Sequence, residues 1–349
     1  MVQKSAVSYF RYSFVVTLIG LVAAAGVGYF YSHSVAGASK ALFLAMVLVV
    51  LEISVSFDNA VVNASVLKEM SPLWRQRFLT WGMLIAVFGM RFVFPLLIVG
   101  VIASVSPWGA LVLAATNPEE YARLMLSAHV NVAAYGGSFL LLVALKYFFD
   151  EAKEIHWIKL IEKPLVRLGK IEAVEIGITL LLIYGNSLLL RVEDRGPFVI
   201  AGIFGILTYI LVDGISAFLE APKELKTAVH KAGFGMFLYL NVLDASFSFD
   251  GVIGAFAITS NLFIIAIGLG VGAMFVRSLT ILLVDKGTLS EFRYLENGAF
   301  YAIGALALLM FLGTHEKVPE VVTGLVGAVF IVVSIWSSVR HKRKLNWSN

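Results

Sequence analysis

Long apolar stretches separated by short charged segments dominate the chain. A membrane-spanning helix needs about 20 mainly apolar residues, and ten stretches approach that length. They run roughly over residues 12–32, 41–64, 78–103, 131–149, 172–190, 198–218, 233–257, 262–284, 298–313 and 320–339. The pattern predicts an all-α, polytopic transmembrane helical bundle of about ten spans, with nine as the alternative count. The first stretch exceeds the roughly 7–15 apolar residues of a signal peptide, so we expect a retained helix.

The composition supports a bilayer environment. Of the 349 residues 59% are hydrophobic and 14% are charged, whereas a soluble domain averages about 45–50% and about 25%. The chain has no Cys, which excludes thiolate zinc sites, iron–sulfur clusters and cysteine nucleophiles. A formal net charge of +4 is too small to indicate nucleic-acid binding.

The positions of the basic residues predict the orientation. If the N-terminus lies inside, 19 of the 27 Lys and Arg residues fall in inside segments and five in outside segments. Cytoplasmic loops of membrane proteins carry this excess. We therefore expect a multi-pass protein of the cell's inner (plasma) membrane with both termini cytoplasmic, a cytoplasmic loop over about 150–171, and a basic C-terminal tail.

An acidic motif occurs twice. Residues 51–64 and 243–256 share an acid, two Ser, a Phe and an Asp at matched offsets, and each copy is followed by an intramembrane arginine, Arg91 or Arg277. On the predicted topology the two copies run in opposite directions. The chain is therefore expected to form two inverted repeats of five spans, residues 1–195 and 196–349, as in many secondary transporters.

The spacing within the motif predicts an interrupted helix. At 100° per residue, Asp58 points about 120° away from Glu52, so a straight helix cannot aim both carboxylates at one point. Breaks near 57–58 and 249–250 would resolve the conflict and free backbone carbonyls as ligands. Acids inside a bilayer are costly, which favours a functional role. The candidate metal ligands are Asp58 and Asp250 as primary ligands, Glu52 and Asp244 as second carboxylates or proton carriers, and Asn59, Asn63, Ser56 and Ser248 as supporting oxygen ligands.

The charge balance points to a divalent cation. Five deep acids, the four motif acids and Asp213, face three deep bases, which leaves two negative charges. Oxygen ligands suit Mg²⁺, Ca²⁺ or Mn²⁺. The bases are expected to supply supporting charge and are Arg91, Arg277 and Lys146. The pattern leaves open the roles of Asp213, Glu175, His129 and His315.

At these motifs the sequence resembles the TerC family of integral membrane proteins. The first motif is similar at Glu52, Ser56 and Asp58–Asn59, and the second at Asp244, Phe247–Ser248 and Asp250. The chain departs from the family at Gly251, where the family usually has Ser. The resemblance covers about 41–105 and 230–315, and it implies Mn²⁺ export.

We therefore predict a transporter, not an enzyme, that exports Mn²⁺ through the lipid bilayer by alternating access, with protons as the simplest counter-ion. A transporter of Ca²⁺ or a small organic cation is the nearest alternative. An intramembrane Asp-dependent hydrolase, or a structural partner of other membrane proteins, belongs to a different class. The sequence does not set the oligomeric state.

Overall fold

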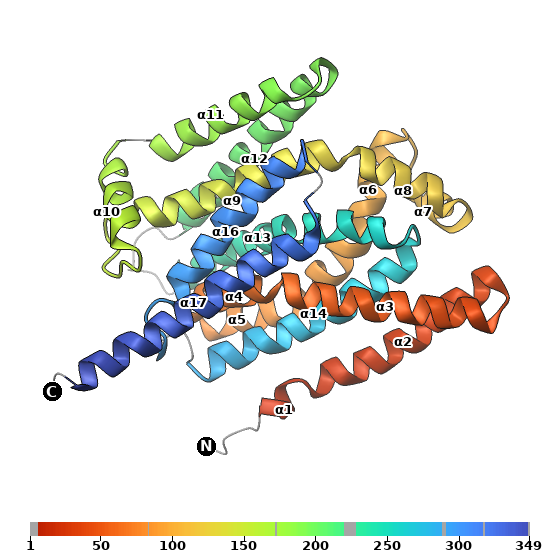
Figure 1. Ribbon diagram of the computed structural model, residues 1–349, viewed down its shortest axis with the longest axis horizontal. Coiled ribbons are helices and arrows are strands. Elements are labelled where there is room, and N and C mark those ends of the chain that lie inside the picture. Colours follow the sequence, from red (N-terminus) through yellow and green to blue (C-terminus); the bar gives the residue numbers. More distant parts are fainter. Residues whose placement is uncertain are drawn as a thin grey trace.

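The computed structural model describes residues 6–82, 84–171, 173–219, 228–287, 291–316 and 318–347, and within these ranges the regular structure is entirely helical (Figure 1). The predicted all-α class is confirmed. In chain order the helices are α1 Ala6–Tyr9, α2 Arg11–Ser32, α3 Val35–Val55, α4 Phe57–Glu69, α5 Pro72–Arg77, the π-helices η1 Phe78–Gly82 and η2 Ile85–Val93, α6 Phe94–Ile102, α7 Pro107–Thr116, α8 Pro118–Ser127, α9 His129–Phe149, α10 Lys159–Leu168, α11 Val174–Leu189, α12 Val192–Leu219, α13 Ala228–Ile258, α14 Leu262–Asp285, α16 Leu295–Gly313 and α17 Glu320–Trp347.

Nine helical segments of the described chain are long and apolar enough to cross a membrane. They match nine of the ten predicted spans. The tenth, predicted over 172–190, is α11, whose 16 residues extend about 24 Å and fall short of a hydrocarbon core of about 30 Å. Figure 1 shows α11 alongside α12 at the outside of the bundle. The protein is a multi-pass membrane protein, and the nine long apolar segments of its described part match the lower of the two expected span counts.

The helices carrying the two motifs run in opposite directions. In Figure 1, α3 and α4 lead toward the end of the bundle where α17 finishes, whereas α13 leads away from it. This arrangement is the one an inverted duplication requires. The division at residue 195 and the cytoplasmic location of both termini stay predictions.

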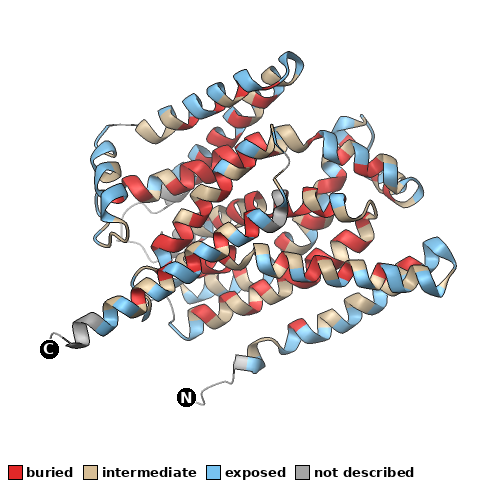
Figure 2. Cartoon of the chain, viewed as in Figure 1, coloured by how far each residue is buried: buried red, intermediate tan, exposed pale blue. Residues whose placement is uncertain are grey.

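The burial pattern matches a bundle surrounded by lipid. Figure 2 shows buried residues concentrated in the middle of the molecule, on α9, α13, α14 and α16, and exposed residues along α2 and the outer face of α17. The exposed positions include large apolar side chains, such as Leu18, Phe30 and Trp336. Apolar residues on the outer surface are unfavourable in water and favourable against acyl chains. The outer helices are therefore the lipid-facing layer.

The predicted helix interruption is present in the first motif and absent from the second. α3 ends at Val55, Ser56 forms a turn, and α4 begins at Phe57. α13 instead continues through 249–250 as one helix of 31 residues. The expectation of a break near Phe249–Asp250 was wrong. Gly251, directly after Asp250, lies inside the continuous helix α13 and allows α13 to pass close to Glu52 of α3.

The loop predicted over 150–171 contains α10 and is fixed by one carboxylate. Glu162 is fully buried and accepts hydrogen bonds from Lys153 Nζ at 2.8 Å, the backbone N–H of Trp157 and Ile158 at 3.0 Å, and Asn297 Nδ2 of α16 at 3.1 Å. Burial alone would raise the pKa of Glu162, but the Lys153 ammonium and the two backbone N–H groups outweigh it and hold the pKa below its usual value. The loop is thereby attached to α16.

Candidate cation site at the crossing of the two motifs

Glu52 lies at the end of α3, just before the helix break. Its Oε1 atom forms an ion pair with the Arg91 guanidinium of η2 and accepts a hydrogen bond from the Ser56 hydroxyl at 2.9 Å. Arg91 also donates to the backbone carbonyl of Ala86 at 2.6 Å. Glu52 and Arg91 are both buried, so each supplies the counter-charge that the other needs in a low-dielectric interior.

Glycines bring two further helices against Glu52. A Cβ atom placed on Gly272 of α14 would lie 2.5 Å from Glu52 Cβ, so the α14 backbone is in tight contact with this side chain. A Cβ on Gly251 of α13 would lie 3.6 Å from Glu52 Oε2, which is an ordinary van der Waals distance. Small residues allow membrane helices to pack this closely. The second motif therefore faces the first across Gly251.

Asp244 connects the two motifs directly. Its Oδ1 atom accepts hydrogen bonds from Asn59 Nδ2 at 2.6 Å and from Asn63 Nδ2 at 3.4 Å. Both asparagines lie on α4, one turn apart, and Asp244 lies on α13. Arg91 and Glu52 are the charged groups that interact electrostatically with Asp244. The acid of the second motif is thus bound to the amides of the first, within the field of the Glu52–Arg91 pair.

Three buried oxygen atoms at this crossing lack a hydrogen-bond partner among the described residues. They are Asn59 Oδ1, Asn63 Oδ1 and Ser248 Oγ. Most buried polar atoms in proteins are hydrogen-bonded, so three orphan oxygens beside one carboxylate form an unusual group. Such oxygens are ligands of the type that hard cations prefer.

Asp58 occupies the first turn of α4, beyond the helix break. Its Oδ1 atom accepts the backbone N–H of Asn59 at 3.0 Å, and within the described chain no ion pair reaches the carboxylate. A Cβ placed on Gly327 of α17 would lie 2.8 Å from Asp58 Oδ2, so this carboxylate packs against the α17 backbone. Asp58 is 4% exposed, yet no described base balances its charge.

Asp250 lies in α13, and its side chain is outside the described residues. The expected convergence of Asp58 and Asp250 therefore stays a prediction. Among the residues that are described, no three His, Asp or Glu side chains are grouped closely enough to hold a metal ion. A cation at the crossing would therefore use amide and hydroxyl oxygens together with fewer than three of the described carboxylates.

A model of a protein family of unknown function, DUF475, matches residues 57–345. The chain belongs to this family. No curated protein and no solved structure matches the chain. The matched region begins immediately after the helix break, so it contains Asp58, Asn59 and the whole second motif but not Glu52. The resemblance to TerC proteins is not part of this match and stays a prediction.

In this DUF475 protein the two remaining motif serines have local roles. Ser54 Oγ donates to the Val50 carbonyl at 2.7 Å, and Ser246 Oγ donates to the Val242 carbonyl at 2.9 Å. Both are bonds to the preceding helical turn, which serines in membrane helices commonly make. These two hydroxyls are thus bonded to their own helices and are not orphan oxygens.

The other two predicted bases lie away from the motif acids. Arg277 of α14 donates from Nε to the Leu79 carbonyl of η1 at 2.8 Å. Lys146 of α9 forms an ion pair with Glu175 at 3.7 Å and is 57% exposed, in a cavity that also contains Asp213. Of the three bases, only Arg91 contacts one of the motif acids whose side chains are described, Glu52, Asp58 and Asp244. Glu52 and Asp244 interact with the Arg91 guanidinium, whereas Asp58 packs against α17. These three described carboxylates and one guanidinium again leave two negative charges.

His129 and His315, whose roles the sequence left open, lie at the end of the bundle opposite the cavity that contains Lys146 and Asp213. His315 Nε2 is hydrogen-bonded to Asn186 Oδ1 at 2.6 Å, and Asn186 Nδ2 donates to Thr314 Oγ1 at 3.1 Å. His129 begins α9 close to Gly313, at the end of α16. The His315 contact fastens α11 to the end of α16.

Glycines lie against the acids at positions that the motif pattern did not predict. Gly272 and Gly327 contact Glu52 and Asp58, and neither belongs to the repeated motif. The signal for Gly272 is its spacing of four residues from Gly268, which packs against Leu48 of α3. Two small residues four apart are typical of closely packed membrane helices.

Proposed function

We propose that this DUF475 protein is a membrane transporter that exports a hard divalent cation, Mn²⁺ in the first place, from the cytoplasm by alternating access. The observation that carries the proposal is the crossing of α4 and α13. Asp244 is buried there beside three oxygen atoms that lack a hydrogen-bond partner among the described residues. A second buried acid, Asp58, precedes Asn59 on α4 and packs against α17. A polar group of this kind inside a membrane bundle is costly unless it has a function.

The proposed cargo follows from the ligand chemistry and the charge. Carboxylate, amide and hydroxyl oxygens suit Mg²⁺, Ca²⁺ and Mn²⁺ and disfavour softer metals. The two negative charges that remain among the described motif acids and Arg91 match one divalent cation. The choice of Mn²⁺ within this class is supported by the resemblance of both motifs to the TerC family.

The motif residues would have different roles in binding the ion. Asp58 and Asp250 would be the primary ligands, with Asn59, Asn63 and Ser248 as supporting oxygens. Asp244 would be a second carboxylate or a proton carrier, since protons are the simplest counter-ion. Glu52 is held by Arg91 and by Ser56, so it would act as a ligand only after that ion pair opens.

The helix break gives the proposed mechanism a mobile element. Ser56 separates α3 from α4, and the Glu52–Arg91 pair lies on the α3 side of this turn, so a tilt of α4 about Ser56 would leave the pair in place. Asp58 and the two asparagines move with α4, whereas Asp244 stays on α13. Such a motion would change the distance between the two halves of the proposed ion site, as alternating access requires.

The test is manganese accumulation in cells. Cells that produce the wild-type protein should contain less Mn²⁺ after a manganese load than cells that produce Asp58→Asn or Asp250→Asn. Glu119→Gln, an exposed acid in α8, is the matched control and should behave as wild type. Equal accumulation with wild type and Asp58→Asn, at equal protein levels in the membrane, would exclude the proposed role of Asp58.

A metal titration of the purified protein separates Mn²⁺ from Ca²⁺. A ligand that binds only the folded state stabilises it by RT ln(1 + [L]/Kd) and so raises the unfolding temperature. We expect Mn²⁺ to stabilise the wild-type protein at concentrations where Ca²⁺ has no effect, and Asp58→Asn to abolish the difference. Stabilisation by Ca²⁺ alone would favour the alternative cargo.

A further inference from the structure

One face of α13 is formed by Phe237, Asn241, Asp244, Ser248 and Gly251. These residues follow one another in steps of four and three, so at 100° per residue they lie within about 80° of one another. Their contacts show the direction of this face: Phe237 packs on α5 and η1, Asp244 is bound by α4, and Gly251 approaches α3. Asn241 therefore lies on the same side of α13, between Phe237 and the crossing of the motifs.

Asn241 carries a fourth orphan oxygen, outside the repeated motif. Its Nδ2 atom donates to the Phe237 carbonyl of the preceding turn at 2.7 Å, which fixes the orientation of the amide because only the nitrogen can donate. The Oδ1 atom is buried and has no hydrogen-bond partner within the described chain. Buried polar atoms usually have a partner, and an amide oxygen is a ligand of the type that hard cations prefer.

Toward the end of the bundle where α4 finishes, this face of α13 is covered by aromatic rings. The centroid of the Phe237 ring lies 5.7 Å from that of Trp74 and 6.3 Å from that of Phe78, and the Phe234 ring lies 5.8 Å from that of Trp74. We call these four residues the aromatic cluster. Trp74 and Phe78 are buried. Hydrophobic constrictions exclude water and ions, so the cluster closes the polar face of α13 at this end.

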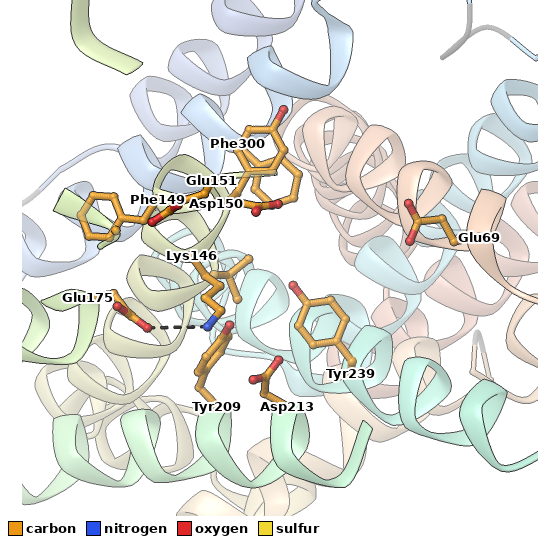
Figure 3. Close-up of a pocket in the computed structure, with 13 residues that line it drawn as sticks. Glu69, Lys146, Phe149, Asp150, Glu151, Glu175, Tyr209, Asp213, Tyr239 and Phe300 are labelled. Atoms are coloured by element: carbon orange, nitrogen blue, oxygen red, sulfur yellow. Dashed lines mark ion pairs between the residues drawn. The ribbon is translucent and has the colours of Figure 1, made fainter. Parts of the chain in front are cut away.

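A cavity of about 630 Å³ at the same end lies on the other side of α13 (Figure 3). Tyr239 points into this cavity, whereas neither Phe237 nor Asn241 lines it. Tyr239 is two residues from each of them, which corresponds to about 200° around the helix. The cavity therefore does not reach Asn241, and the aromatic cluster is the barrier on the side of α13 that carries the crossing.

Arg75 connects the aromatic cluster to the helix that carries the two asparagines of the crossing. Its guanidinium donates to the carbonyls of Leu67 at 2.9 Å and Lys68 at 3.1 Å, both in the last turn of α4. These bonds satisfy carbonyls at the helix end and attach α5 to α4. A displacement of α4 would therefore move Trp74 of α5 relative to Phe237 of α13.

We propose that Asn241 is a further ligand of the transported cation, on a path between the crossing and the aromatic cluster, and that this cluster is the gate of the path. Since both roles presuppose a transported cation, they rest on the proposed function. Asn241 lies about 4.5 Å from Asp244 along α13, which is a short step for an ion that exchanges one oxygen ligand for the next. On α4 the orphan Oδ1 of Asn63, one turn nearer to the cluster than Asn59, would line the same path. On the predicted topology the gate faces the cytoplasm.

Cysteine labelling tests the gate without requiring transport. The chain has no Cys, so Asn241→Cys introduces a single thiol. A charged methanethiosulfonate reagent is applied to membrane vesicles on the face that carries α5, which labelling of the exposed position in Gln76→Cys identifies. We expect slow labelling of Asn241→Cys, and at least about tenfold faster labelling when Trp74→Ala or Phe237→Ala is added, because each removes a ring that closes the path.

Val242→Cys is the matched control for a general loosening of the bundle. Val242 is next to Asn241 but lies on another side of α13, where it packs against the hydrophobic core. Its labelling should stay slow when Trp74→Ala is added. The Phe237→Ala variant keeps the test valid if Trp74→Ala does not fold.

The Mn²⁺ dependence of flux tests the ligand. In proteoliposomes Asn241→Ala should raise the KM for Mn²⁺ at least about threefold with a smaller change in kcat, because an oxygen ligand is lost. Asn241→Asp, which keeps a side-chain oxygen, should restore the KM. Asn186→Ala, which removes an amide at the other end of the bundle, should leave the KM unchanged.

Three results would overturn the proposal. They are fast labelling of Asn241→Cys in the otherwise unchanged protein, equal labelling rates with and without both ring-removing substitutions, and an unchanged KM in Asn241→Ala. Labelling that depends on Trp74 in a protein without Mn²⁺ flux would contradict only the transport proposal. Normal Mn²⁺ flux with labelling that is independent of Trp74 and Phe237 would contradict only the gate.

Discussion

The two copies of the acidic motif differ in their helices, because the first copy lies across a helix interruption and the second lies in one continuous helix. In the first copy the helix is interrupted at Ser56, and its two acids have different surroundings: Glu52 is paired with Arg91, and Asp58 packs against the backbone at Gly327. In the second copy α13 is continuous, and Asp244 is held by the amides of the first copy. One sequence pattern therefore occurs once in an interrupted helix and once in a continuous helix.

The comparison shows that acids of one motif differ in the groups that balance or hydrogen-bond their charge. Glu52 has a counter-charge, Asp244 has hydrogen-bond donors, and Asp58 has only a backbone N–H. A carboxylate with the fewest partners is the one best able to exchange its ligands. Asp58 is therefore the residue on which the proposed ion binding depends most.

Removing Arg91 should have the largest effect on stability. Arg91→Met leaves Glu52 buried without a counter-charge, and breaking a buried ion pair costs about 3–5 kcal/mol in the free energy of unfolding. Arg277→Met, which removes a bond to a backbone carbonyl, should cost about 1–2 kcal/mol. Unfolding in mixed micelles measures both variants.

The double variant Glu52→Gln with Arg91→Met tests the reason for this effect. Because it removes both charges, it should regain most of the stability that Arg91→Met loses. A double variant as unstable as Arg91→Met would show that Arg91 acts through packing and not through its charge.

The two glycines that approach Glu52 should differ in their tolerance of a side chain. Gly272→Ala places a Cβ atom 2.5 Å from Glu52 Cβ and should cost about 1–3 kcal/mol. Gly251→Ser should be tolerated, because its Cβ atom has an ordinary contact at 3.6 Å. Thermal unfolding of the purified variants measures the difference, and equal losses would contradict the described packing of α13 and α14 around Glu52.

The smallest expected effect concerns the residue at the helix break. Ser56→Ala removes the hydrogen bond to Glu52 and should cost about 0.5–1.5 kcal/mol. Ser54→Ala removes a bond to the same helix at an exposed position and should be near neutral. A larger loss for Ser54→Ala in the same unfolding assay would contradict the role assigned to Ser56.

The sequence allowed the fold class, nine of the spans and the first helix break to be predicted, because each depends on local hydropathy or on helical geometry. The partners of the acids depend on how distant helices cross, which no local pattern contains. Gly251 illustrates the problem, since a glycine in a membrane helix favours either a break or a close approach. The contact of Asn59 with Asp244, 185 positions apart, lies beyond local reasoning for the same reason.

Manganese flux into proteoliposomes tests the central claim most directly. Purified protein is reconstituted into vesicles that contain a fluorophore quenched by Mn²⁺, and the initial rate is measured for wild type, Asp58→Asn, Asp244→Asn and the control Glu119→Gln. We predict that wild type and the control transport Mn²⁺ at equal rates and that each aspartate variant is at least about tenfold slower. Absence of Mn²⁺ flux with wild type, or an unchanged rate in Asp58→Asn, would contradict the claim that this protein transports Mn²⁺ through Asp58.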